Sequence, residues 1–300
     1  KMPDPTAIGE LHGAQHLREM GVEALQFAAL SQWHGPPHDC FVVQGVHRPV
    51  NDNFVELLFW IDALKRASAS QVTAVIPYFS YAKGDKKDEP RVSIRARVCA
   101  DAIEKAGADR VLTMDLHSPQ IQGFFRIPVD QLVAAPILCE HVKRGDLTDC
   151  VLVAGDVGEA KELGRFANLL HLPVAVVDKR RYGDDDRAVA TNLIGAVKGK
   201  HAIIVDDEIA TGGTIIEATN FLIDRGALSV RVMATHGVLS GPAIERIENS
   251  PLDQLIITNS IALSPQAQQC KKIVVLSVAR LLGQAIKNIH EEASVSSLFV

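Results

Sequence analysis

The segment with the clearest potential for chemistry reads AIIVDDEIATGGT and spans residues 202–214. A short apolar run ends in two adjacent carboxylates, Asp206 and Asp207, and a TGGT turn at 211–214 follows before an amphipathic stretch. A Gly/Thr turn between a strand and a helix is an anion cradle, because glycine lets backbone N–H groups approach a ligand and a helix N-terminus favours negative charge. The acids would repel a lone phosphate, but carboxylates accept hydrogen bonds from sugar hydroxyls and can hold Mg²⁺ beside them. A ribose 5-phosphate unit has this layout. The alternative is a simple capped turn, and a P-loop is excluded because its GK[ST] ending is absent.

Charged residues or histidine also follow four other predicted strands. In parallel α/β sheets ligands bind beyond the carboxyl ends of the strands, so these positions are candidates for the same site. Taken alone, a lone histidine is more often structural, and a basic or mixed-charge loop is more often a solvated turn. The residues that follow the strands are the loop FSYAKGDKKDEPR after 72–78, Asp115 and His117 at the end of 110–116, Asp156 after 150–155, and Lys179, Arg180 and Arg181 at the end of 173–179.

The elements that must position these residues alternate between short apolar strands and amphipathic helices. This alternation predicts an α/β protein with a largely parallel sheet. Nine strands are many for one sheet, so we expect two stacked α/β units divided near 144–146. The predicted strands lie at 40–45, 72–78, 110–116, 150–155, 173–179, 201–207, 230–236, 254–260 and 272–278, and the clearest helices at 53–67, 94–107, 159–170 and 215–226.

The composition is that of an ordinary globular protein of 300 residues with a net charge of −5. This charge gives no sign of nucleic-acid binding, and no run of 18 apolar residues predicts a membrane span. The first residues show no apolar signal-peptide core. The five cysteines are scattered and never form a CxxC pair, which favours a cytoplasmic location over disulfides or structural zinc. They are Cys40, Cys99, Cys139, Cys150 and Cys270.

The DD…TGGT pattern resembles the phosphoribosyl-binding fingerprint of type I phosphoribosyltransferases and of ribose-phosphate diphosphokinases. Longer segments favour the second family, and the resemblance covers roughly residues 40–300. It implies two phosphoribosyltransferase-like domains at 1–144 (ATP side) and 145–300 (ribose 5-phosphate side), with the last helix packing back on the first domain. The segments are NDNFVELLFWIDALKRASASQVTAVIPYFSYAKGDKKDEPR, VLTMDLHSPQIQGFFRIPVD, VVDKRR, THGVLSGPAIERI and SVSSLF.

This resemblance implies Mg²⁺-dependent transfer of diphosphate from ATP to the anomeric hydroxyl of ribose 5-phosphate, which yields 5-phosphoribosyl 1-diphosphate (PRPP) and AMP. It also implies a homo-oligomer, a hexamer of dimers. The implied roles are catalysis by Lys179 and Arg181; ATP binding by Lys83, Gly84, Asp85, Asp88 and His117; ribose 5-phosphate binding by Arg181, Asp206, Asp207, Ala210, Thr211, Gly212, Gly213 and Thr214; and Mg²⁺ binding by His117 and Asp156, with a second Mg²⁺ at Asp206 and Asp207.

The sequence departs from the family pattern in places that leave two alternatives open. Residues 1–39 lack the opening strand and the adenine-contacting FSDGE loop, Lys83-Gly84 replaces Arg-Gln in the ATP loop, and Ala210 replaces an acid. These changes favour a non-catalytic subunit that associates with active ones. A phosphoribosyltransferase that consumes PRPP would share the cradle, but it does not explain the other segments.

Overall fold

The computed structural model describes residues 39–155, 160–181 and 188–298. The described residues form two compact units, the first drawn from Lys1–Val133 and Ser277–Val300 and the second from Ala134–Leu276. No helix in the described part of the chain is both long and apolar enough to cross a membrane.

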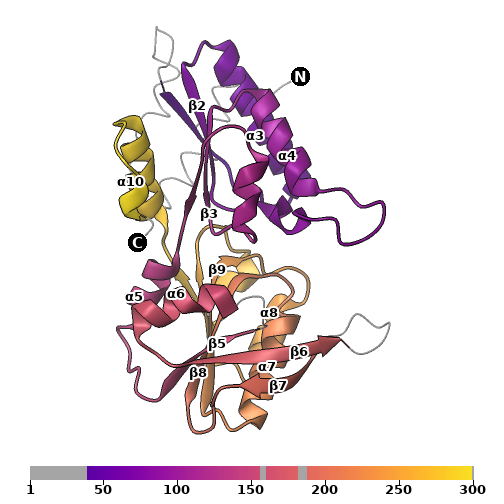
Figure 1. Ribbon diagram of the computed structural model, residues 1–300, viewed down its shortest axis with the longest axis vertical. Coiled ribbons are helices and arrows are strands. Elements are labelled where there is room, and N and C mark those ends of the chain that lie inside the picture. Colours follow the sequence, from indigo (N-terminus) through magenta and orange to yellow (C-terminus); the bar gives the residue numbers. More distant parts are fainter. Residues whose placement is uncertain (1–38, 156–159, 182–187, 299–300) are drawn as a thin grey trace. The chain divides into compact units, whose positions relative to one another are not determined.

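The described residues of the first unit form a four-stranded sheet in which every strand is parallel to its neighbours (Figure 1). The strands lie in chain order: β1 (Asp39–Val43), β2 (Gln71–Ile76), β3 (Arg110–Met114) and β4 (Val129–Leu132). Almost every residue of β2 and β3 is buried. Such strands, covered on both faces, read as continuous apolar runs rather than as alternating ones.

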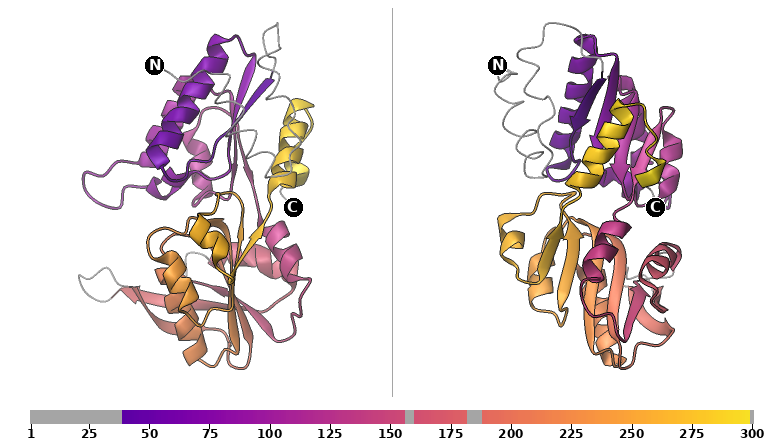
Figure 2. Two further views of the ribbon diagram at one scale, coloured as in Figure 1. Left: turned by 180° about the vertical axis from the view of Figure 1, so that it is seen from behind. Right: turned by 90° about the vertical axis from the view of Figure 1, so that its left-hand side faces the viewer.

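Helices cover both faces of this sheet. Leu57, Ile61 and Ile103 anchor α3 (Val50–Arg66) and α4 (Arg95–Ala106) in the core on one face. Figures 1 and 2 show α10 (Ala279–His290) on the opposite face. In the described residues, three short 3₁₀ helices complete this unit: η2 (Ser80–Gly84), η3 (Pro119–Phe124) and η4 (Ser296–Leu298).

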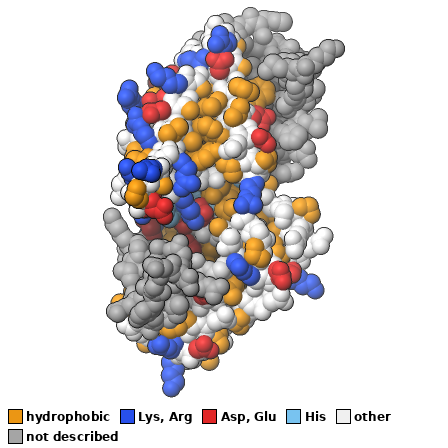
Figure 3. All heavy atoms as spheres, turned by 90° about the vertical axis from the view of Figure 1, so that its right-hand side faces the viewer, with side chains coloured by type: hydrophobic (Ala, Val, Ile, Leu, Met, Phe, Trp, Pro, Cys, Tyr) orange, Lys and Arg blue, Asp and Glu red, His pale blue; other side chains and the backbone are white. Residues whose placement is uncertain are grey.

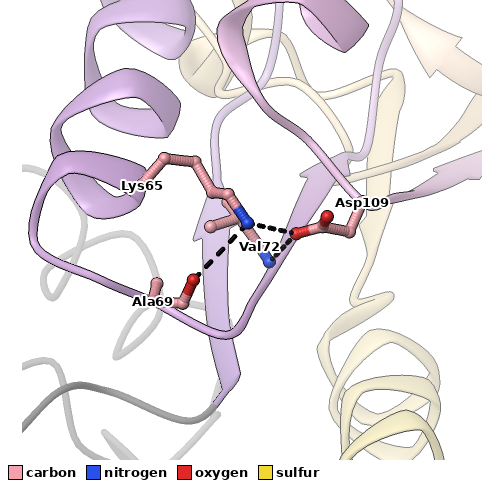
Figure 4. Close-up of polar contacts among 4 residues, drawn as sticks. All are labelled: Lys65, Ala69, Val72 and Asp109. Atoms are coloured by element: carbon pink, nitrogen blue, oxygen red, sulfur yellow. Dashed lines mark hydrogen bonds and ion pairs between the residues drawn. The ribbon is translucent and has the colours of Figure 1, made fainter.

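A polar cluster joins α3 to the starts of β2 and β3, at the edge of the sheet away from the strands' carboxyl ends (Figure 4). The backbone N–H of Val72 donates to Asp109 Oδ2 at 2.7 Å, and Lys65 Nζ lies 3.1 Å from the same oxygen. Lys65 Nζ also donates to the carbonyl of Ala69 at 3.4 Å. Asp109 thus fixes the relative placement of two strands whose other ends carry candidate site residues.

Most of the aromatic side chains considered for the first unit pack against its core, with one exception. Phe54, Trp60, Phe124 and Phe125 pack against the buried cluster. Phe59 instead is 64% exposed, because it lies on the side of α3 opposite the buried Leu57, Ile61 and Leu64. Hydrophobic side chains gather on this face of the unit in Figure 3, and Val55 and Val98 are among the exposed ones.

The second unit has a seven-stranded sheet in the order β11-β10-β9-β8-β5-β6-β7, parallel except for the antiparallel pair β6–β7. Core residues of α7 and α8 pack on one face of the sheet, and α6 contacts β5 and β6. The strands are β5 (Cys150–Ala154), β6 (Val174–Arg181), β7 (Ala188–Ile194), β8 (His201–Ile209), β9 (Ser229–Gly237), β10 (Gln254–Thr258) and β11 (Ile273–Leu276); the helices are α5 (Ala135–Val142), α6 (Ala160–Leu170), α7 (Gly213–Asp224), α8 (Ala243–Glu248) and α9 (Pro265–Gln269).

The predicted fold class is confirmed: the chain is α/β, with two mostly parallel sheets flanked by helices. All nine predicted strands are present, and β4 and β7 are additional. The division between the units falls between Val133 and Ala134, whereas the sequence suggested 144/145. The difference arises because α5 contacts α6 and β9 of the second unit. The unusual N-terminal segment and the loop 182–187 lie outside the described residues.

Candidate functional site

The predicted phosphate cradle lies where β8 ends and α7 begins. Gly212 is the N-cap of α7 and has a φ of +74°. Residues other than glycine rarely adopt this left-handed backbone conformation. Among the described residues, the backbone N–H groups of Gly212, Gly213 and Thr214 have no hydrogen-bond acceptor. Unpaired N–H groups at the first turn of a helix are the donors that bind a phosphate. The local geometry therefore suits an anion.

The two acids that precede the cradle are held by the main chain. Asp206 Oδ1 accepts from the N–H of Asp207 at 2.8 Å, and Asp207 Oδ1 accepts from the N–H of Glu208 at 2.7 Å. These bonds orient both carboxylates without removing their charge. Both acids are half-buried.

Strand alternation assigns Asp206 to the face of the sheet that α7 covers. Ala202 and Ile204 of β8 belong to the same buried cluster as Ile215 and Leu222 of α7. Because side chains in a strand point to alternate faces, Asp206 shares the side of these residues and Asp207 points to the other side. Asp206 is thus the acid on the same side as the cradle.

An arginine that the sequence reasoning did not single out completes the cradle. Arg246 of α8 donates through Nη1 to the backbone carbonyl of Thr211 at 2.9 Å. A Cβ at Gly213 would lie 3.3 Å from the same nitrogen. Neighbouring backbone bonds also hold the loop, since the N–H of Ser240 donates to the carbonyl of Ala210 at 2.8 Å. The loop between β9 and α8 therefore braces the turn between β8 and α7.

The residues expected to bind ATP lie at the carboxyl edge of the first unit's sheet. Lys83 and Gly84 are in η2, which follows β2; Asp85 comes directly after η2, and Asp88 comes three residues later. His117 is exposed and follows β3, the neighbour of β2. Thr113 Oγ1 donates to the carbonyl of Ile76 at 2.8 Å and so ties the ends of these two strands together.

The glycine in this loop makes room for another side chain. A Cβ at Gly84 would lie 2.6 Å from Arg95 Nε and 2.8 Å from Arg95 Cβ. Arg95 is exposed and opens α4. The position where the resemblance leads one to expect a glutamine is therefore filled by an arginine that comes from further along the chain.

Three predicted site residues lie wholly or partly outside the described part of the chain. Lys179 is the third residue from the end of β6 and Arg181 is its last residue, and their side chains lie outside the described part. Asp156 lies outside it altogether. β6 is parallel to β5 and ends at the same edge of the second sheet as β8. By their strand positions, Lys179 and Arg181 belong to the edge that carries the cradle.

The described residues hold no group of three or more His, Cys, Asp or Glu side chains that could bind a metal ion. Asp206 and Asp207 nevertheless supply the oxygen ligands that Mg²⁺ prefers, and Mg²⁺ usually binds through one or two carboxylates plus substrate phosphates. Because alternation places only Asp206 on the cradle side of β8, this acid fits a Mg²⁺ that is shared with a bound substrate.

Thiol chemistry does not fit the cysteines. All five are free. Burial raises the pKa of Cys99 and of Cys139 to about 11. These thiols stay protonated at neutral pH and are poor nucleophiles.

Known proteins match the chain over most of its length. Residues 36–107 match the N-terminal domain of ribose phosphate pyrophosphokinase, and residues 185–300 match the phosphoribosyl synthetase-associated domain. A ribose-phosphate pyrophosphokinase of Clostridium acetobutylicum is 49% identical over 87% of this chain and 82% of its own length. One from Caldanaerobacter subterraneus subsp. tengcongensis is 50% identical over 86% of this chain and 82% of its own.

A solved structure supports the same relationship. Phosphoribosylpyrophosphate synthetase from Mycobacterium smegmatis superposes with a TM-score of 0.81 at 38% identity, covering 87% of this chain and 85% of that one. The structural similarity agrees with the α/β fold of parallel sheets flanked by helices. The chain belongs to the ribose-phosphate pyrophosphokinase family of transferases.

Proposed function

We propose that the protein transfers the β,γ-diphosphoryl group of ATP to the anomeric hydroxyl of ribose 5-phosphate and releases PRPP and AMP. The observation that carries the proposal is the cradle between β8 and α7, where unpaired N–H groups suit the 5-phosphate and Asp206 suits the ribose hydroxyls. Membership of the ribose-phosphate pyrophosphokinase family supports the same reaction.

The transfer itself needs little covalent chemistry from the protein. The anomeric oxygen forms a bond to the β-phosphorus of ATP, the bond from that phosphorus to the α,β-bridging oxygen breaks, and AMP leaves with the bridging oxygen while the hydroxyl proton is released. Catalysis then consists mainly of positioning and of stabilising negative charge. Lys179 and Arg181 would supply cations to the transferring group, and Thr211 to Thr214 would hold the 5-phosphate.

The ATP side of the proposal rests on Lys83, Gly84, Asp85, Asp88 and His117 beyond the ends of β2 and β3. His117 and Asp156 would hold the Mg²⁺ that accompanies ATP, and Asp206 would hold a second one together with substrate oxygens. Bound Mg²⁺ would neutralise phosphate charge and so lower the repulsion between the two substrates. A cytoplasmic location and a homo-oligomeric assembly are part of the proposal.

Formation of AMP should require both ribose 5-phosphate and Mg²⁺. The test is to incubate the purified chain with ATP and to quantify AMP with and without ribose 5-phosphate, Mg²⁺ and excess EDTA. We expect AMP only in the complete mixture, because the acids and the transferring phosphates repel each other without the cation. AMP release that ignores ribose 5-phosphate would contradict the proposal.

A subunit that binds substrates without converting them is the second candidate, and the Lys83-Gly84 loop favours it. In that case ribose 5-phosphate would bind measurably in calorimetry while no AMP forms. The phosphoribosyltransferase alternative is disfavoured, because the similarity to ribose-phosphate pyrophosphokinases extends over 87% of the chain.

A further inference from the structure

We propose that Arg246 is a specificity-determining residue of the ribose 5-phosphate site: it sets the direction of the cradle's backbone and supplies the positive charge that the adjacent acids make necessary. This inference rests on the proposed function and deepens it. It assigns a role to a residue of α8, an element separate in sequence from both β8 and α7.

The first step is the geometry of one peptide bond. Arg246 Nη1 donates to the carbonyl of Thr211 at 2.9 Å. The Thr211 carbonyl and the Gly212 N–H belong to the same planar trans peptide and point in opposite directions. By binding the oxygen, Arg246 keeps that carbonyl away from an anion and turns the Gly212 N–H toward the opposite side. This N–H has no acceptor among the described residues, although Gly212 is buried.

The second step is the distance from Arg246 to the first turn of α7. Arg246 Nη1 lies 3.3 Å from the point where a Cβ of Gly213 would stand. The guanidinium therefore lies against the turn whose Gly213 and Thr214 N–H groups are also unpaired in the described structure. A guanidinium is always charged, and its hydrogen bond to the Thr211 carbonyl holds that charge beside this turn. No acidic side chain of the described residues pairs with Arg246.

The third step is charge. The segment that leads into the cradle carries Asp206, Asp207 and Glu208, whereas the TGGT turn itself has no cation. Unpaired N–H groups and a helix dipole contribute only partial charges. Arg246 is hydrogen-bonded to this turn and places a full positive charge beside it. It can offset the acids for a ligand that is anionic at one end and carries hydroxyls at the other.

The test compares Arg246→Ala, Arg246→Lys and Arg246→Gln with the unaltered protein. Lysine keeps the charge, and glutamine keeps only a neutral donor for the Thr211 carbonyl. We expect Arg246→Ala to raise the KM for ribose 5-phosphate roughly 10- to 100-fold, the range for a charge-assisted hydrogen bond, with the KM for ATP changed less than about twofold. Arg246→Lys should raise the KM for ribose 5-phosphate much less than Arg246→Ala does. Arg246→Gln should raise it more than Arg246→Lys.

Arg225→Ala is the matched control. Arg225 caps the far end of α7, and its guanidinium lies over the Phe221 ring at 4.5 Å. Its removal should leave both KM values unchanged. Thermal unfolding of every variant shows whether a loss of binding reflects a loss of folding.

Calorimetric binding of ribose 5-phosphate and of ribose separates this inference from the proposed function. Arg246→Ala should weaken the binding of ribose 5-phosphate and leave the affinity for ribose unchanged, whether or not the chain forms PRPP. An equal rise in the KM for both substrates, an unchanged affinity for ribose 5-phosphate, or glutamine restoring binding as well as lysine would overturn the inference. Absence of PRPP formation by the unaltered protein, with this binding pattern intact, would count against the proposed reaction alone.

Discussion

Replacement of Lys179 by alanine should lower kcat roughly 100- to 1,000-fold while the KM for each substrate changes little. A cation placed where charge develops stabilises the transition state more than the bound substrates, so its loss appears in kcat. Lys179 lies near the carboxyl end of β6, and β6 ends at the same edge of the sheet as β8. Initial rates of AMP formation at varied ATP and ribose 5-phosphate measure both parameters.

Lys200→Ala is the control for this prediction. Lys200 immediately precedes β8, so it lies at the amino end of the strand whose carboxyl end carries the cradle. Its removal should leave kcat within about twofold, because charges at a distance beyond the Debye length are screened. A Lys179→Ala enzyme that keeps its full kcat, or loses only affinity, would show that Lys179 does not act on the transferring group.

Replacement of Asp206 by asparagine should raise the KM for ribose 5-phosphate by roughly 10-fold or more, with little effect on ATP. The carboxylate accepts bonds from ribose hydroxyls and attracts Mg²⁺, and an amide of the same shape does neither as well. Asp206 is chosen because it shares the α7 face of β8 with Ala202 and Ile204. Rates at saturating ATP and varied ribose 5-phosphate give the KM.

Asp224→Asn serves as the matched acid, since Asp224 is the last residue of α7 and the cradle is at its first. It should leave the KM for ribose 5-phosphate unchanged. If Asp206→Asn raised the KM for ATP and the KM for ribose 5-phosphate equally, Asp206 would not contact the ribose specifically. It would instead bind a metal shared by both substrates or stabilise the fold.

The sequence predicted most reliably those strands whose residues are all buried. Every residue of β5 is buried, so CVLVA reads as an uninterrupted apolar run. The strands that were missed do not show this pattern. β4 is VDQL, with two polar residues in four positions, and β7 is antiparallel and follows a polar loop.

The cradle could be located from sequence because its residues are contiguous and because a left-handed N-cap requires a residue such as Gly212. Arg246 could not be found in the same way. An arginine in a short helical stretch reads as a solvated charge, and only the fold brings it to the Thr211 carbonyl. The same holds for Arg95, which fills the space that Gly84 leaves open.

The most direct test of the proposed reaction is a ³¹P NMR time course of the purified chain with ATP, ribose 5-phosphate and Mg²⁺. The proposed mechanism predicts that AMP and the diphosphate resonances of PRPP grow in equal amounts as both substrates disappear, without ADP. The appearance of ADP would place the attack at the γ-phosphorus and contradict diphosphoryl transfer. An unchanged spectrum, while ribose 5-phosphate still binds, would contradict catalysis and identify the chain as a substrate-binding subunit.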